Sequence, residues 1–365
     1  MKSNYYKLGD FIEQTEERNK DFAISLSQGI CNLKYFQNPR QVAENSAADK
    51  IVRTGWFAYN RATTRNGDKI SIAYRDKEDC TVSASYLTFK IKDENLLNPY
   101  YLMLWFKRPE FDRYARFKSH GSAHEYFEWE EMCDVMLPVP SIEEQRKIVA
   151  EYQAVERRIE NNRRLIAKLE ETAQTIYRNM FVDNIDPENV PQGWRLGSIN
   201  ELSTLKVGGD KPLNFSLSPD IDHNIPIFSN GIINEGLYGY TDKFSIDSPS
   251  FTISARGTIG KCFLRLHPYF SIVRLISVIP KDLNTLMYQF FFFSNLNIEG
   301  DGSVQNQLTV PFLSSEKMII PNTTLMHLFN ERVLPFFKHI EILNGENYIN
   351  YNFLSLLLSK LSKLN

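Results

Sequence analysis

The sequence predicts an α/β protein of two similar domains, each followed by a long helix, with the two helices pairing as an antiparallel coiled coil. Three observations predict it: apolar residues recur at heptad spacing in two places, proline-containing segments precede both, and short patterns recur in the same order in both halves. At 365 residues the chain exceeds the length that one hydrophobic core normally serves, and its 42% hydrophobic content can supply two cores.

These patterns suggest four consecutive segments. We expect a first domain over residues 1–138, a central helix over 139–185, a second domain over 186–322 and a distal helix over 323–365.

The first helix follows Leu137-Pro-Val-Pro-Ser141. Proline interrupts a preceding helix, Ser141 can cap the new one, and Glu144 lies at the capping-box position three residues later. Apolar residues then recur at alternating steps of four and three, which is typical of a coiled coil, and Asn162 interrupts them where a buried Asn can select register. The apolar positions are Ile148, Tyr152, Val155, Ile159, Ile166, Leu169, Ala173, Ile176 and Met180.

A second heptad run follows the second domain. Asn347 and Asn350 interrupt it, and two alternatives stay open: Asn344-Gly-Glu-Asn347 either continues the helix or breaks it, and Pro335 either kinks the helix or begins it. The apolar positions are Met326, Phe329, Val333, Phe336, Ile340, Leu343, Leu354, Leu357, Leu361 and Leu364.

The two halves of the chain share several short patterns. Lys7-Leu-Gly-Asp corresponds to Arg195-Leu-Gly-Ser, and two β-rich runs end in Lys92-Asp93 and Lys281-Asp282. Gly121-Ser122 and Gly302-Ser303 precede the two proline segments by similar distances. The shared order favours an internal duplication over chance similarity.

The composition restricts the class of protein. No basic and apolar leader and no run of roughly 20 apolar residues occur, so we expect a cytoplasmic protein without a membrane span. Cys31, Cys80, Cys133 and Cys262 lack paired spacing, which favours reduced thiols over disulfides or a zinc site. The net charge is −2, yet residues 50–120 carry 14 Lys or Arg against 8 Asp or Glu.

No catalytic pattern is evident in the sequence. His120 and His124 have HxxxH spacing without the Glu or third ligand of a zinc enzyme, so we expect no metal. The phosphate-binding glycine patterns and the Asn/Asp-Pro-Pro-Tyr/Phe signature of amino-methyltransferases are missing. Two similar domains separated by a rod of about 60 Å instead fit a ligand with two similar half-sites, such as duplex DNA.

The chain resembles the specificity (S) subunits of type I restriction-modification systems over nearly its whole length. The resemblance is carried by Leu137-Pro-Val-Pro-Ser-Ile-Glu-Glu-Gln145, Pro191-Gln-Gly-Trp194-Arg-Leu-Gly, Arg256-Gly-Thr-Ile-Gly260-Lys and Gly302-Ser-Val-Gln-Asn-Gln-Leu308. It implies two α/β target-recognition domains, each reading half of a split DNA sequence. One departure is Ile320-Pro-Asn-Thr-Thr-Leu-Met-His327, which lacks the Glu-Gln pair. This departure puts in question whether a partner subunit docks equally on both repeats.

The resemblance also implies partners. A non-catalytic subunit of this kind docks methyltransferase (M) subunits, which hold S-adenosylmethionine and methylate adenine, and works with restriction (R) subunits. The expected coiled-coil and docking residues are Gln145, Ile148, Tyr152, Val155, Ile159, Asn162, Ile166, Leu169, Ile176, Phe329, Val333, Phe336, Ile340, Leu343, Leu354, Leu357 and Leu361. The alternatives are the specificity protein of a smaller restriction system without a motor, and a coiled-coil adaptor that binds proteins.

Base edges are read by Arg, Lys, Asn, Gln and His side chains, with neighbouring cations on phosphates. The first-domain candidates are Arg61, Arg65, Asn66, Lys69, Arg113, Arg116, Lys118, His120 and His124. The second-domain candidates are Lys206, Lys211, Asn224, Asn230, Arg256, Lys261, Gln305, Asn306 and Gln307. The alternative for each one is an ordinary surface residue.

Overall fold

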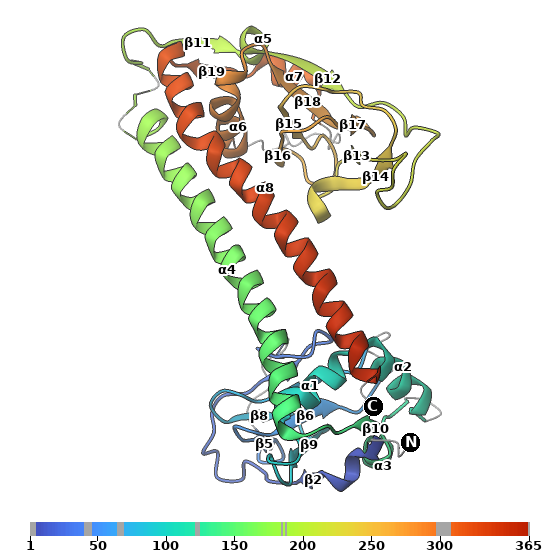
Figure 1. The fold of residues 1–365 in the computed structure, drawn as a ribbon. Helices are drawn as coiled ribbons and strands as arrows, with labels where there is room; N and C mark the ends of the chain where they lie inside the picture. Colours follow the sequence, from blue (N-terminus) through green and yellow to red (C-terminus); the bar gives the residue numbers. More distant parts are fainter. Residues whose placement is uncertain are drawn as a thin grey trace. The chain divides into compact units, whose positions relative to one another are not determined.

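The computed structural model describes residues 5–39, 46–63, 69–120, 125–183, 185–186, 188–296 and 308–363. Its contacts divide the chain into unit 1, residues 1–161 with 346–365, and unit 2, residues 162–345. Two long helices, α4 (Ile142–Phe181) and α8 (Thr323–Lys360), contribute residues to both units (Figure 1). The four-segment division expected from the sequence stays a prediction.

The described residues of unit 1 form short strands and three short helices, together with its parts of α4 and α8. Its elements are β1 (Tyr5–Lys7), η1 (Leu8–Asp10), β2 (Ile12–Thr15), β3 (Gly29–Ile30), β4 (Phe36–Gln37), β5 (Lys50–Val52), β6 (Phe57–Asn60), β7 (Ile72–Tyr74), β8 (Cys80–Val82), β9 (Tyr86–Ile91), α1 (Pro99–Lys107), α2 (Pro109–Lys118), α3 (Trp129–Cys133), β10 (Met136–Pro138) and the terminal turn η4 (Leu361–Lys363).

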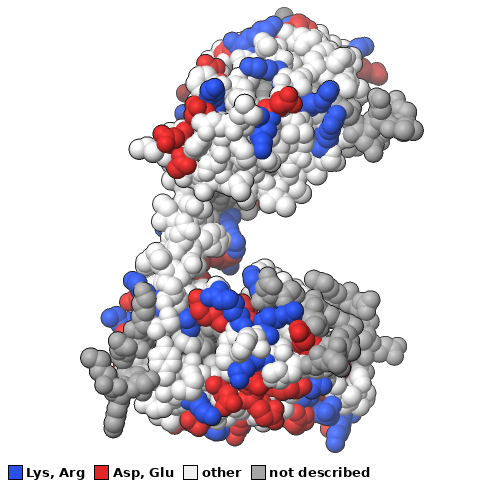
Figure 2. All heavy atoms as spheres, turned by 90° about the vertical axis from the view of Figure 1, so that its right-hand side faces the viewer, with Lys and Arg blue, Asp and Glu red and all other residues white. Residues whose placement is uncertain are grey.

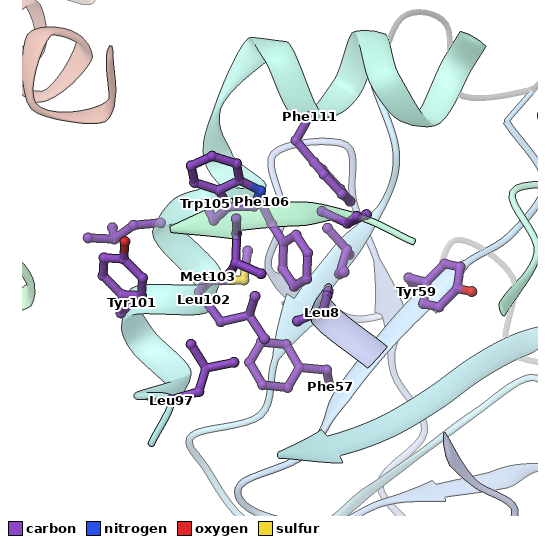
Figure 3. Close-up of a cluster of buried hydrophobic side chains, with 14 of the residues drawn as sticks. Leu8, Phe57, Tyr59, Leu97, Tyr101, Leu102, Met103, Trp105, Phe106 and Phe111 are labelled. Carbon is purple, nitrogen blue, oxygen red and sulfur yellow. The ribbon is translucent and has the colours of Figure 1, made fainter. Parts of the chain in front are cut away.

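Helix α1 covers the central sheet of unit 1 and forms much of its core. Pro99 stands at the first helical position, where the missing N–H costs nothing, and the Asn98 side chain accepts hydrogen bonds from the next backbone amides. Figure 3 shows Phe57 of the sheet and Leu102 and Phe106 of α1 turned toward one another, and all three are fully buried.

Unit 2 contains a similar set of elements. They are β11 (Arg195–Ser198), α5 (Ile199–Leu202), β12 (Ser203–Val207), β13 (Ile225–Phe228), η2 (Ile233–Gly236), β14 (Leu237–Thr241), β15 (Ser250–Ile253), β16 (Cys262–Arg265), β17 (Phe270–Ser271), β18 (Ile276–Pro280), η3 (Leu283–Thr285), α6 (Leu286–Asn295), α7 (Val310–Ser315) and β19 (Lys317–Ile320).

The main sheets of the two units share one topology, which confirms the predicted duplication. The four-stranded antiparallel sheet has the order β2-β9-β6-β7 in unit 1 and β12-β18-β15-β16 in unit 2. In each unit the first strand pairs with the strand before a long helix, as β1–β10 and β11–β19. The Lys-Asp patterns also correspond, because Lys92 Nζ donates to Gly9 O at 2.9 Å and Lys281 Nζ donates to Asn200 O at 2.7 Å.

The long helices pack together and run antiparallel, as predicted. In unit 1, Ile148 and Tyr152 of α4 line one groove with Leu357 and Leu358 of α8, whereas further along α4 Arg158 contacts Glu346 at 2.6 Å. Residue numbers therefore rise along one helix as they fall along the other. In unit 2, Tyr177 and Phe181 of α4 pack against Phe329 of α8, with ring centroids 5.9 and 5.2 Å apart.

The structure decides both alternatives left open for the second helix. Helix α8 is continuous from Thr323 through Gly345 to Lys360, and Pro335 lies inside it rather than at its start. The first helix begins as expected after Ser141, whose hydroxyl accepts a hydrogen bond from the Glu144 amide at 3.3 Å.

The structure also describes the thiols and the hydrophobicity of the helices. Cys31, Cys80, Cys133 and Cys262 are free thiols. Within the described ranges, none of the helices combines the length and the apolar character needed to span a membrane.

Candidate nucleic-acid interface

In unit 1 the structure brings together two groups of candidate residues that are far apart in sequence. Arg61 follows β6, and its carbonyl accepts a hydrogen bond from the Phe127 amide at 2.8 Å. Ala62 and His120 both form β-bridges with Tyr126. The segment after β6 therefore lies beside the end of α2 and the residues that precede α3.

The cations of this surface are paired with carboxylates. Arg61 contacts Glu128 at 3.3 Å and lies over the Tyr126 ring. Lys118 and His120 both contact Glu131 at 3.1 Å. These hydrogen bonds, from His120 first and Lys118 second, lower the pKa of the Glu131 carboxyl below its usual value.

Two further candidates of unit 1 follow the same pattern. Arg116 contacts Glu125 at 3.2 Å, and Arg113 contacts Glu110 at 3.1 Å. Lys69 is exposed, whereas Arg65, Asn66 and His124 lie outside the described residues. Figure 2 shows one face of the protein, on which basic and acidic side chains are interspersed. A phosphate that approached these cations would therefore compete with carboxylates.

Unit 2 repeats this junction. The Ala255 carbonyl, just after β15, accepts a hydrogen bond from the Leu308 amide at 2.9 Å, as the Arg61 carbonyl does from Phe127. Strands β15 and β6 hold the same place in their sheets. Phe127 and Leu308 both follow a Gly-Ser pair by the same number of residues. The segments that begin at Arg61 and at Ala255, from which candidates were predicted independently, thus start at equivalent positions.

Asn230 holds three loops of unit 2 together. Its Nδ2 donates to Val273 O at 2.6 Å, and its Oδ1 accepts from the Ala255 amide at 2.7 Å. The Val273 amide in turn donates to Gly209 O at 2.8 Å. The candidate segments around Lys206–Lys211, Asn230 and Arg256–Lys261 therefore meet at one place.

The remaining unit 2 candidates have varied surroundings. Lys206 Nζ donates to Ser245 O at 2.6 Å, Lys211 lies 3.8 Å from the Phe215 ring centroid, and Lys261 lies 5.9 Å from that of Phe263. Asn224 and Arg256 are exposed, and Gln305, Asn306 and Gln307 lie outside the described residues.

Sequence reasoning missed Arg274, which the structure places at this junction. Its amide donates to Gly208 O at 2.9 Å, and Val273 and Arg274 have φ values of 53° and 61°. Neither residue belongs to a type that favours the left-handed region. The sequence around them carries no turn signal that could have identified this exposed arginine.

The predicted docking residues mostly face the interior of their own unit. Gln145 is fully buried, and its amide donates to Leu96 O at 2.9 Å and Pro140 O at 2.8 Å while accepting from the Asn98 amide at 2.8 Å. The buried members are Gln145, Tyr152, Ile159, Asn162, Phe329, Val333, Ile340, Leu343, Leu354 and Leu361. The half-buried members are Ile148, Val155, Ile166, Leu169, Ile176, Phe336 and Leu357.

Other apolar side chains of the long helices are exposed instead. They are Leu165, Leu328 and Ile342 in unit 2, and Tyr348, Ile349, Tyr351, Phe353 and Leu356 in unit 1. They lie outside the predicted heptad positions, although the leucine-rich end of the second helix, which includes Leu356, is visible in the sequence. In the described part of the chain, no group of three or more His, Cys, Asp or Glu side chains is arranged to hold a metal ion.

Comparison with known proteins agrees with this repeated architecture. The family model of the type I restriction modification DNA specificity domain matches residues 4–171 and again residues 191–348. The chain belongs to this family. The two matched regions of this specificity-family protein contain the two equivalent sheets, so each half carries one target-recognition domain.

Similar proteins carry the same designation. A putative type I specificity subunit of Mycoplasma pneumoniae is 30% identical over 146 residues, which are 40% of this chain and 43% of that protein. The HindI specificity subunit of Haemophilus influenzae is 19% identical over 431 aligned positions, covering 91% of this chain and 93% of that protein. The chain spans less than half the length of the M. pneumoniae relatives that it matches.

A solved structure shows the same fold. The type I restriction-modification S subunit from M. genitalium superposes with a TM-score of 0.69 at 12% identity, over 98% of this chain and 95% of that one.

Proposed function

We propose that this chain is the DNA-specificity subunit of a type I restriction-modification system, and that each of its two domains reads one half of a bipartite DNA target. The observation that carries the proposal is the repeated junction at Arg61–Phe127 and Ala255–Leu308, because it gives both domains a loop cluster in the same position. A duplex DNA target with two half-sites offers two separate binding sites, one for each of these loop clusters.

In this proposal the chain itself is non-catalytic and acts in the cytoplasm. Methyltransferase subunits, which hold S-adenosylmethionine, dock on it and methylate adenine, and restriction subunits join the same complex. Because α4 and α8 contribute to both units, they are the elements proposed to connect the reading domains and fix the half-site spacing.

Affinity for DNA should depend on the partners. The net charge is −2, and the unit 1 cations Arg61, Arg116 and Lys118 all contact carboxylates. Because phosphate contacts by cations supply most non-specific affinity, the isolated chain should bind DNA weakly and with strong salt dependence. Salt-insensitive nanomolar binding by the chain alone would contradict this dependence of DNA affinity on the partner subunits.

Methylome sequencing of a host that expresses the complete system tests the proposal. The expected result is adenine methylation at a two-part motif with a non-specific spacer, and its loss when only this chain is deleted. Methylation that persists without the chain would refute the proposal. The same experiment with and without the restriction subunit gene tests the alternative of a smaller system without a motor.

A further inference from the structure

The hairpin of β13 and β14 in unit 2 ends in a tip that exposes two neighbouring apolar side chains. Ile232 is 55% exposed and Ile233 is 81% exposed. Single exposed apolar residues are common on protein surfaces, so exposure alone assigns no role. The constrained backbone of this tip is the observation that indicates a role for the two isoleucines.

The tip has an unusual and locked backbone. Asn234 and Glu235 are consecutive left-handed residues with φ values of 47° and 55°, a conformation that L residues rarely adopt in succession. Gly236 follows with a φ of 82°, and a Cβ there would lie 2.3 Å from Ser229 O. The Ser229 amide donates to Gly236 O at 2.8 Å and closes the loop.

A buried arginine clamps the strained residue. Arg265 Nη1 contacts the Glu235 carboxylate at 2.9 Å, and its Nη2 donates to the Glu235 backbone carbonyl at 2.6 Å. The guanidinium carbon lies 3.5 Å from the Phe228 ring centroid. Although burial lowers the pKa of Arg265 to about 10, the group stays charged at neutral pH. Strain that the surroundings enforce in this way is typical of functional sites.

The residues around the tip indicate what it contacts. Asn230, two residues before Ile232, ties the hairpin to Ala255 and Val273. Arg256 and Arg274, the residues that follow these two, are exposed. Exposed arginines on the two loops that Asn230 ties to an apolar hairpin tip suit duplex DNA, because cations contact phosphates while isoleucine contacts thymine methyl groups or inserts between base steps.

We propose that Ile232 and Ile233 make apolar contact with base pairs of the half-site read by unit 2, and that Arg265 and Glu235 are positioning residues for this tip. Arg274 contacts a neighbouring phosphate. This inference rests on the proposed function, and it names residues that determine specificity within it.

The test compares Ile233→Ser with Leu217→Ser in the complete methyltransferase complex. Leu217 is a matched control, because it is 78% exposed in the same unit but lies outside the tip. Affinity for a duplex carrying the methylation motif is measured over a series of salt concentrations, after circular dichroism has shown that each variant is folded.

We expect Ile233→Ser to lower cognate affinity by about tenfold, the loss expected for one buried apolar side chain, without changing the salt slope. Arg274→Ala should instead reduce the magnitude of the slope by about one, because it removes a phosphate contact. Leu217→Ser should bind as the wild type does. Discrimination by Ile233→Ser should fall at motif positions in one half-site only.

Two modified duplexes distinguish insertion between bases from contact with a thymine methyl group. If the tip inserts between bases, 2-aminopurine in that half-site will brighten with the wild type and not with Ile233→Ser. If it contacts a methyl group, uracil in place of thymine will weaken the wild type and leave Ile233→Ser unchanged. Either result supports the proposal.

Unchanged affinity and discrimination for Ile233→Ser, while the wild-type complex is sequence-specific, would overturn this inference and leave the proposed function standing. A wild-type complex without any sequence preference would instead refute the proposed function.

Discussion

Tyr101 and Tyr288 make the same hydrogen bond in the two halves of the protein. Each is the third residue of its helix, α1 or α6, and each is almost completely buried. The Tyr101 hydroxyl donates to Pro138 O at 2.9 Å, and the Tyr288 hydroxyl donates to Ile319 O. Both acceptors belong to the strand that precedes a long helix, so the repeated bond ties that strand to the helix covering the sheet.

We predict that Tyr101→Phe and Tyr288→Phe each lower the free energy of unfolding by about 1 kcal/mol, because each leaves a carbonyl without its donor, in a buried bond at Pro138 and a partly buried one at Ile319. The two residues share no partner, so the double variant should show the sum of both losses. Chemical denaturation followed by fluorescence measures these values. A double variant no less stable than either single variant would show that the bonds are not independent features of two repeats.

Gln145 should be a structural residue rather than part of a docking surface. Gln145→Leu leaves Leu96 O, Pro140 O and the Asn98 amide without their partner, and we predict a loss of about 3 kcal/mol in unfolding free energy. The neighbouring exposed Arg146→Leu is the control and should change stability little. Equal stability of the two variants would contradict the role given to the buried amide.

The repeated fold could be predicted from the sequence because its signals are local. Heptad spacing, the proline segments and the Gly-Ser pairs each mark a boundary without reference to the other half. The continuity of α8 could not be predicted, because Gly345 and Pro335 are poor helix formers by intrinsic propensity. Packing of their neighbours, such as Phe329 and Leu343, outweighs that propensity.

The candidate interface was predictable only as loops of suitable composition. The polar segments at Arg61 and Arg256 were identified from residue type, and the structure shows that they occupy equivalent positions. The pairing of Arg61 with Glu128 joins residues 67 positions apart. No local pattern predicts such a contact, and none marks the tip at Ile233, whose conformation depends on the distant Arg265.

The end of α8 and the terminal turn η4 should stabilise unit 1 itself. Leu361 is buried in the core of unit 1, whereas Leu356 is 59% exposed. We predict that Leu361→Ala costs about 3 kcal/mol, and that Leu356→Ala changes stability by less than about 0.5 kcal/mol. Thermal unfolding of both variants measures this. For the same reason we expect a chain truncated after Asn350 to assemble less well, because the truncation removes Leu361 from the core of unit 1.

The carboxylates beside the unit 1 cations should limit DNA binding. Glu128→Gln removes the charge that Arg61 contacts, so we predict severalfold tighter binding to any duplex and a steeper salt dependence. Glu143→Gln, on an exposed turn of α4, is the control for the change in net charge. Identical effects of the two substitutions would mean that the local pairing of Arg61 has no influence on binding.

The central claim is that the two halves are separate readers of one DNA target. The most direct test replaces residues 1–137 with the corresponding segment of a family member of different specificity and sequences the methylome of a host expressing the complete system. The prediction is that one half of the methylated motif changes while the other half and the spacer stay the same. A motif that changes in both halves, or in neither, would contradict the account.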